Sequence, residues 1–197
     1  MITILDYGAG NLRSVQNTLA ELGAEYELVR DSEGLRRATK IILPGVGHFG
    51  QMMRALDAMQ VREALLDRIR AGVPFLGICL GLQALFEKSE EAPDERGLGL
   101  FSGEIRRFPA EARVPHMGWN DVERKNGSKL LGGLPPHPYL YFAHSYYAPL
   151  HDSTAATCAY SVEYTAVLED KNVCGVQFHP EKSGPLGLRV VRNFIEL

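Results

Sequence analysis

Short apolar runs alternate with segments of helical periodicity in the first half of the chain. Four runs rich in β-branched or apolar side chains are expected to form strands: residues 2–5, 26–29, 40–43 and 74–78. A helix is expected after Asn11, which can cap it, and Gly23 stops it. Two more helices are expected at about 51–59 and 61–71. This alternation is typical of parallel strands joined by crossover helices.

The pattern changes from about Gly99 onward to short strands and turns. Strands are expected in six segments: 99–101, 103–108, 139–147, 154–161, 164–170 and 173–178. No flexible linker separates the two halves, so we expect a partly antiparallel extension of the same sheet and a single domain over 1–197. A last helix carries Leu188, Val191 and Ile195 on one face. The predicted fold class is α/β, with a mixed, mostly parallel central sheet flanked by helices.

Composition narrows the function classes. The 197 residues are 45% hydrophobic, with a net charge of -3 and no basic block, which does not favour binding to nucleic acid or an anionic membrane. The longest apolar stretch, residues 73–86, is interrupted and too short to cross a bilayer, and the first residues lack a secretory signal pattern. Three cysteines without CxxC spacing predict neither a disulfide framework nor a metal site, and they fit a reducing cytoplasm.

The stretch "GICLGLQ", residues 77–83, places Cys79 between two glycines, after an apolar run and before a helical-looking segment. This pattern has the form of a nucleophile elbow with sulfur in place of oxygen. Gly77 and Gly81 are expected because a Cβ there would collide with the neighbouring chain. The sharp turn predicts a strained backbone that exposes the thiol at the carboxyl edge of the sheet, beside a helix N-terminus.

A second motif, "GVQFHPEKS", follows a predicted strand and carries His179 and Glu181. Residues two apart in an extended segment face the same way, so Glu181 can orient the imidazole of His179. The other ring nitrogen is then free to face a thiol. We expect these two residues to form a Cys-His-Glu arrangement with Cys79.

Two further segments have plainer interpretations. Residues 87–96, "EKSEEAPDER", are charged and contain Pro93, so we expect a solvated loop. Cys158 and Cys174 alternate with apolar residues in strand-like runs, which predicts core positions.

These motifs together resemble the class I (triad-type) glutamine amidotransferases over essentially the whole chain. "PGVGHFG" (44–50) is similar to the oxyanion loop of that family, "GICLGLQ" to its nucleophile elbow and "GVQFHPEKS" to its base-and-carboxylate segment. Three more stretches, "DYGAGNLRSV" (6–15), "VPHMGWN" (114–120) and "YFAHSYY" (141–147), resemble the glutaminase subunits of imidazole glycerol phosphate synthases. The resemblance implies a flavodoxin-like fold.

The resemblance also implies an activity, the hydrolysis of glutamine to glutamate and ammonia without a cofactor. Cys79 would attack the side-chain amide and form a thiol ester, while His179 moves protons and Glu181 orients His179. Backbone N–H groups of Leu80 and of Val46 or Gly47 would hold the oxyanion. The implied glutamine-binding residues are Gly47, Gln83, His144, Ser145 and Tyr146.

By the same resemblance, the ammonia passes to a partner, the (β/α)8-barrel cyclase subunit of imidazole glycerol phosphate synthase, in a heterodimer that serves histidine biosynthesis. The expected interface residues are His116, Met117, Trp119, Asn120, Tyr141 and Lys182. Three alternatives remain open. They are the glutaminase subunit of another synthase (anthranilate, guanylate or pyridoxal phosphate pathway), a non-catalytic regulatory module on the same fold, and a stand-alone cysteine hydrolase.

Overall fold

An eight-stranded sheet forms the centre of the computed structural model, which describes residues 1–125 and 127–197. Its strand order is β2-β1-β3-β4-β13-β12-β11-β8. The first five strands in this order run parallel: β2 (Tyr26–Val29), β1 (Ile2–Leu5), β3 (Ile41–Gly45), β4 (Phe75–Cys79) and β13 (Val173–Val176). The remaining strands pair antiparallel: β12 (Val162–Asp170), β11 (Thr154–Tyr160) and β8 (Glu123–Arg124). The predicted mixed α/β sheet is confirmed, with strand boundaries within one or two residues in the parallel half.

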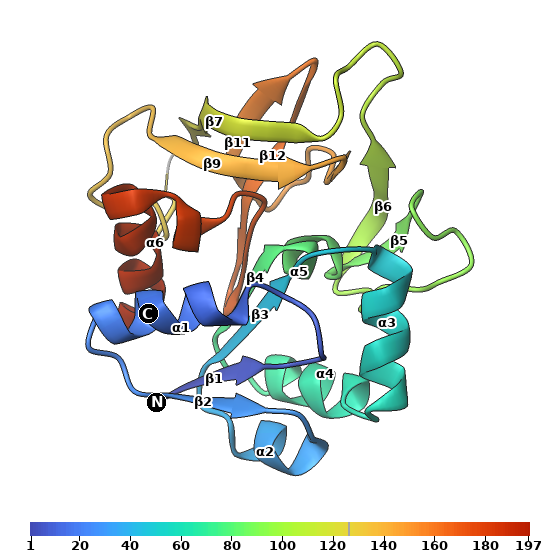
Figure 1. The fold of residues 1–197 in the computed structure, drawn as a ribbon, viewed down its shortest axis with the longest axis vertical. Coiled ribbons are helices and arrows are strands. Elements are labelled where there is room, and N and C mark those ends of the chain that lie inside the picture. Colours follow the sequence, from blue (N-terminus) through green and yellow to red (C-terminus); the bar gives the residue numbers. More distant parts are fainter. Residues whose placement is uncertain (126) are drawn as a thin grey trace.

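Helices cover both faces of this sheet (Figure 1). On one side lie α1 (Leu12–Glu21) and α6 (Gly184–Glu196), and on the other lie α3 (Phe49–Ala58) and α4 (Arg62–Arg70). The sheet side chains alternate between two hydrophobic cores: Ile42 faces the core that includes α1 and α6, whereas Leu43 faces the core of α3 and α4. This alternation follows from the two-residue period of a strand.

The C-terminal helix is rotated from the predicted face. Val190, Val191 and Phe194 are buried in α6, whereas Leu188 and Ile195 lie half-buried at its flank. A short helix, α2 (Ser32–Arg37), was not predicted from the hydrophobic pattern. Its signal was at its ends, because Asp31 caps it by accepting a hydrogen bond from the backbone of Gly34 at 2.7 Å.

Two smaller sheets stand beside the central one, which corrects the expectation of a single extended sheet. One contains β10 (Tyr146–Tyr147), β6 (Phe101–Arg107) and β5 (Phe86–Ser89), and the other pairs β7 (His116–Asp121) with β9 (Tyr139–His144). The helix after the elbow, α5 (Leu80–Gln83), is a single turn, because the chain from Phe86 enters β5 and pairs with β6. Tertiary pairing thus overrides the helical pattern, and part of the predicted solvated loop is a strand.

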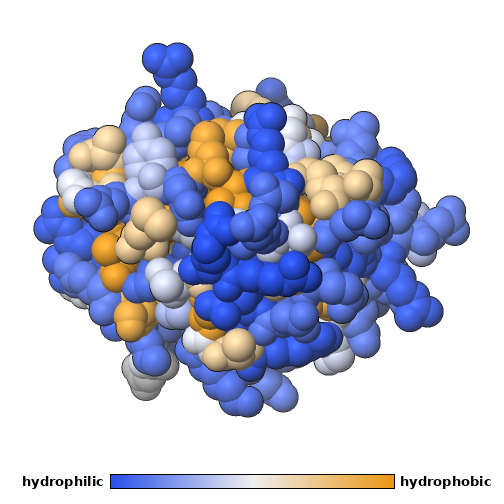
Figure 2. Space-filling view, turned by 90° about the horizontal axis from the view of Figure 1, so that it is seen from below, coloured by the Kyte–Doolittle hydropathy of each residue, from blue (hydrophilic) through white to orange (hydrophobic). Residues whose placement is uncertain are grey.

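The end of the molecule seen from below in Figure 2 is predominantly hydrophilic, with hydrophobic side chains showing between the polar ones. The small β7–β9 sheet lies at the opposite end (Figure 1). Within the described parts of the chain, every helix is too short or too polar to cross a membrane.

Candidate active site

Cys79 is the last residue of β4 and stands at the N-terminus of α5. Its backbone has φ 54° and ψ -105°, a conformation that a residue with a side chain rarely adopts. The flanking glycines are required by space. A Cβ on Gly77 would collide with the backbone of Gly81, and a Cβ on Gly81 would collide with the carbonyl oxygen of Leu43. The strained turn and the steric need for glycine agree with the sequence prediction. The expectation of an exposed thiol is wrong, because Cys79 is buried, with 5% of its surface exposed.

The structure brings Cys79, His179 and Glu181 together. β13 pairs with β4 in parallel, so the segment after Val176 emerges next to Cys79. The Nδ1 atom of His179 lies 2.9 Å from the Oε1 atom of Glu181, and the Cys79 sulfur is close enough to the imidazole to raise its pKa. Because a carboxylate only accepts, Nδ1 carries the hydrogen and Nε2 is left for the sulfur.

His179 is held between two groups that favour its charged form. Its side chain is 3% exposed and that of Glu181 is 2% exposed. Burial by itself lowers the pKa of His179, but the neighbouring Cys79 sulfur and the Glu181 carboxylate outweigh it and raise the pKa above its ordinary value. An imidazolium beside the sulfur is the charge environment of a reactive cysteine.

Asn11 contributes to this site rather than to the helix that follows it. It occupies the N-cap position of α1 but makes no side-chain capping hydrogen bond, which corrects the expectation from sequence. Its Nδ2 atom instead donates to Oε1 of Glu181 at 3.4 Å, and its Oδ1 atom accepts from the Ser14 hydroxyl at 2.8 Å. The second oxygen of Glu181, Oε2, is buried without a hydrogen-bond partner among the described residues.

A pocket of about 180 Å³ opens at the thiol. All the residues that the resemblance assigned to glutamine binding and to the oxyanion line it: Val46, Gly47, Leu80, Gln83, His144, Ser145 and Tyr146. They come from three separate parts of the chain. The fold therefore gathers one recess around Cys79 with polar groups on several sides.

The loop after β3 carries the expected oxyanion donors. Gly47 has φ +96°, in the region that favours glycine. The Tyr7 hydroxyl donates to the carbonyl oxygen of Val46 at 3.3 Å, and burial raises the pKa of Tyr7 to about 12, so it stays a donor. The Val46 side chain is 37% exposed. One tyrosine from "DYGAGN" thus holds the orientation of this peptide.

His144 is a neutral member of the pocket wall. Its Nδ1 atom lies 2.8 Å from the carbonyl oxygen of Tyr146, and its Nε2 atom lies 3.3 Å from the Tyr164 hydroxyl. Since the carbonyl only accepts, Nδ1 donates and Nε2 accepts. Burial lowers the pKa of His144 to about 3, so the ring shapes the pocket without adding charge.

Glu91 and Pro115 also line the pocket, and sequence reasoning missed both. Glu91 lay in the segment expected to be a solvated loop. Its Oε2 atom accepts a hydrogen bond from the backbone of Phe49 at 2.7 Å, which anchors the carboxylate at the start of α3. Nothing in the local pattern marked this glutamate, because its role depends on the distant helix that holds it.

Five of the six expected interface residues lie on the β7–β9 sheet and divide between its two faces, whereas Lys182 ends the 3-10 turn Pro180–Lys182. Met117 and Trp119 point outward and are 64% and 55% exposed, and the Trp119 ring packs edge-on against Tyr141 at 6.1 Å. The Lys182 ammonium lies 5.9 Å from the centre of the Tyr141 ring. Tyr139, which was not predicted, belongs to the same face and is 58% exposed. We call Met117, Trp119, Tyr139, Tyr141 and Lys182 the outer patch.

His116, which was expected at the interface, does not share the exposed face of Met117 and Trp119. His116 is 4% exposed and stacks on Tyr160, with ring centres 4.0 Å apart. Asn120 is half-buried, and its amide donates to the carbonyl oxygen of Ala159 at 3.1 Å. Both residues alternate with Met117 and Trp119 along β7, so they lie on its inner face.

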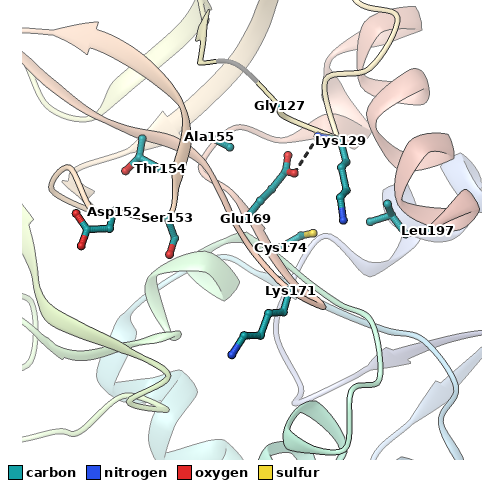
Figure 3. Close-up of a pocket in the computed structure, with 10 residues that line it drawn as sticks. All are labelled: Gly127, Lys129, Asp152, Ser153, Thr154, Ala155, Glu169, Lys171, Cys174 and Leu197. Atoms are coloured by element: carbon teal, nitrogen blue, oxygen red, sulfur yellow. Dashed lines mark hydrogen bonds between the residues drawn. The ribbon is translucent and has the colours of Figure 1, made fainter.

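A second pocket, of about 280 Å³, lies beside β11 and β12 (Figure 3). Lys129, Lys171, Asp152 and Glu169 line it together with Cys174. The carboxylate of Glu169 accepts hydrogen bonds from the Ser128 hydroxyl and from the backbone of residues 129 and 130, which gives it a structural role. The described residues form no cluster of three metal-ligating side chains, in this pocket or elsewhere.

Comparisons with known proteins agree with this geometry. Residues 3–197 match the model of the family described as glutamine amidotransferase class-I. The protein of Methanothermobacter thermautotrophicus named imidazole glycerol phosphate synthase subunit HisH is 48% identical, covering 100% of this chain and 98% of its own length. The Desulfitobacterium hafniense protein of the same name is 45% identical, covering 98% of this chain and 93% of its own length.

Solved structures show the same fold at lower identity. One described as a glutamine amidotransferase aligns with a TM-score of 0.78 and 22% identity, covering 99% of this chain and 97% of that one. A chain from the structure of PurLQS from Thermotoga maritima aligns with a TM-score of 0.77 and 19% identity, with the same coverage. The chain belongs to the class I glutamine amidotransferases and, among them, to the family of HisH subunits.

Proposed function

We propose that this chain hydrolyses glutamine to glutamate and ammonia and supplies the ammonia to the cyclase subunit of imidazole glycerol phosphate synthase in histidine biosynthesis. The observation that carries the proposal is the meeting of Cys79, held in a strained turn, with a buried His179–Glu181 pair at the edge of a polar pocket. We place the activity in the cytoplasm, where free thiols stay reduced.

The chemistry follows from the positions of the three side chains. The Cys79 sulfur attacks the amide carbon of glutamine, and the resulting oxyanion is held by the backbone N–H of Leu80 and one N–H from the loop at Val46 and Gly47. His179 gives its proton to the departing nitrogen, and ammonia leaves a thiol ester on Cys79. His179 then takes a proton from water, which attacks the ester and releases glutamate.

Glutamine also needs partners for its charged ends. Glu91 is anchored through one oxygen by the backbone of Phe49, and as a wall residue of the pocket it supplies the negative charge that suits the substrate's α-ammonium. Gln83 and the segment at Ser145 and Tyr146 provide neutral polar groups on the other walls. Together they orient the amide toward Cys79.

The outer patch is the docking surface in this proposal. Aromatic residues and methionine are enriched at the centres of protein interfaces, and the patch gathers Met117, Trp119 and Tyr139 in exposed positions. It adjoins the active site, since Lys182 follows Glu181 directly in the chain. A (β/α)8-barrel cyclase subunit seated here in a heterodimer would shield ammonia from solvent and protonation.

The test measures glutamate formation by the full chain, alone and with the cyclase subunit and its phosphoribulosyl imidazole-carboxamide nucleotide. We expect a large increase in the rate of glutamate formation when the partner and its ligand are present. This activity should be lost in Cys79→Ala and kept in the matched variant Cys158→Ala. Equal rates in wild type and Cys79→Ala would overturn the mechanism. High turnover without the cyclase subunit would instead indicate a stand-alone hydrolase.

A further inference from the structure

Gln177 lies next to the nucleophile in the sheet. Val176, the last residue of β13, pairs with Ile78 of β4. Gln177 directly follows Val176 and Cys79 directly follows Ile78, so these two residues lie side by side. Gln177 is fully buried, and its backbone N–H donates to the carbonyl oxygen of Ala166 at 2.9 Å. The parallel register thus fixes its main chain at the level of the thiol.

The side-chain amide of Gln177 has a partner at each end. Its Nε2 atom donates to the Cys79 sulfur at 3.6 Å, and its Oε1 atom accepts from Nε2 of Gln83 at 3.1 Å. Nε2 of Gln83 also donates to the carbonyl oxygen of Tyr146 at 2.8 Å. A buried amide with both ends engaged is held in one place.

The direction of this chain of hydrogen bonds is determined by one group. The backbone carbonyl of Tyr146 can only accept, so the amide nitrogen of Gln83 must face it. The second hydrogen of that nitrogen then requires an acceptor, which is Oε1 of Gln177. Gln177 is left with its N–H donor directed at the sulfur, and the opposite orientation of its amide would place two donors against each other.

A neutral donor at this place favours one state of the sulfur. A thiol is a weak acceptor, whereas a thiolate accepts a charge-assisted hydrogen bond of roughly twice the usual strength. An amide does not take up the proton, so it leaves the acid–base work to His179. The same donor assists when the thiolate leaves in the hydrolysis of the thiol ester.

We propose that Gln177 is a catalytic residue whose side-chain amide donates a hydrogen bond to the Cys79 sulfur and stabilises the thiolate. The proposal rests on the proposed function in taking Cys79 as the nucleophile. Gln83 acts through Gln177 as its positioning residue, in addition to lining the glutamine pocket. The competing interpretation is that Gln177 only satisfies Gln83 within the core.

The first experiment measures the pH dependence of Cys79 alkylation by iodoacetamide in the full chain, with the modified residue identified by mass spectrometry. It needs neither glutamine nor the cyclase subunit, so its outcome is independent of the glutaminase assay. Cys158 and Cys174 interfere little, because burial raises the pKa of these thiols to about 11 and about 12. Far-UV circular dichroism and thermal unfolding establish that each variant is folded.

Two substitutions remove the donor while keeping the length of the side chain, Gln177→Glu and Gln177→Met. We expect the midpoint of Cys79 alkylation to rise by about one to two pH units in both, given the strength of a hydrogen bond to a charged group. The control Gln51→Glu makes the same change at an exposed glutamine and is expected to leave the midpoint unchanged. An unchanged midpoint in a folded Gln177 variant would overturn the proposal.

A second measurement needs no variant at this position. In ¹⁵N-labelled wild-type chain, the side-chain amide signal of Gln177 should move with pH at the same midpoint as Cys79 alkylation, and the shift should disappear in Cys79→Ala. If the chemical shift of this amide does not change as Cys79 ionises, the amide does not donate to the sulfur. This result decides the proposal even if both substitutions prevent folding.

Discussion

The backbone N–H of His179 donates to the carbonyl oxygen of Tyr141 at 2.8 Å. Tyr141 carries part of the outer patch on β9, so the strand proposed to meet the partner also fixes the main chain of the proposed base. The hydroxyl of Ser183 strengthens this connection by donating to the His179 carbonyl and accepting from the Tyr141 backbone. The proposed docking surface and the proposed catalytic base therefore share one hydrogen-bonded unit.

Replacing Trp119 tests the outer patch. We expect Trp119→Ala to raise the Kd for the cyclase subunit at least about thirtyfold, because truncating an interface aromatic at a hot spot costs about 2 kcal/mol or more. Isothermal titration calorimetry measures this change. Leu150→Ala is the control, since Leu150 is similarly exposed at 48% but lies outside the outer patch. An unchanged Kd in Trp119→Ala would place the interface elsewhere.

The role of Glu181 is tested by removing its charge. Glu181→Gln keeps the shape of the side chain but no longer stabilises imidazolium, so we expect kcat to fall about 10²–10⁴-fold. Glu181 is one of the groups that raise the pKa of His179, so the basic limb of the pH–rate profile should move to lower pH. Steady-state kinetics across pH measure both effects, with exposed Glu163→Gln as control. A normal kcat with an unmoved limb would contradict this assignment.

Glu91 should affect glutamine binding rather than the chemical step. We expect Glu91→Gln to raise KM about 10–100-fold with little change in kcat, the size of effect that follows the loss of one charge-assisted hydrogen bond. The neighbouring Glu90→Gln is a matched control, because Glu90 instead accepts from the backbone of Arg107 at 2.7 Å. Equal KM values in the two variants would exclude Glu91 from substrate recognition.

Two of the buried histidines, His144 and His116, lower the stability of the fold as the pH falls. Burial lowers the pKa of His144 to about 3 and that of His116 to about 4, both below the ordinary 6.5. Between these values and pH ~6.5 the unfolded chain binds more protons than the folded chain. The contribution to stability is therefore complete above about pH 6.5 and declines as the pH falls toward the folded-state values.

Urea unfolding from about pH 7 to about pH 5 tests this linkage. The free energy of unfolding should fall by up to about 1.4 kcal/mol per pH unit for His144. In His144→Phe the dependence should be flatter by that amount, whatever the absolute stability of the variant. Parallel curves for the two proteins would show that His144 is protonated to the same extent in both states.

The sequence predicted the features that depend on local chemistry. The elbow at Cys79 and the spacing of His179 and Glu181 could be predicted from short motifs. The steric limits of a tight turn and the two-residue period of a strand act over only a few residues. The parallel strands and the main helices followed from hydrophobic periodicity, whereas the single turn of α5 and strand β5 did not. Phe86 pairs with distant Phe101, and no local pattern encodes that partner.

The residues whose surroundings the sequence did not predict depend on packing between remote segments. In the sequence, His116 is a polar residue close to Trp119. In the folded chain, the alternation of side chains along β7 places it on the inner face, where it stacks on Tyr160. A strand over "PHMGWN" would place His116 on the opposite face from Met117 and Trp119, because alternate residues of a strand face opposite sides. Glu91 and Gln177 acquire their places only when α3 and β4 stand beside them, so their proposed roles became visible in the folded chain.

The most direct test of the central claim is to acid-quench the reaction of the chain with glutamine, in the presence of the cyclase subunit, and to locate the acyl group by mass spectrometry. The account predicts a glutamyl adduct on the peptide that contains Cys79, and its absence in Cys79→Ala. Glutamate formation with the adduct on another residue, or undiminished turnover in Cys79→Ala, would contradict it.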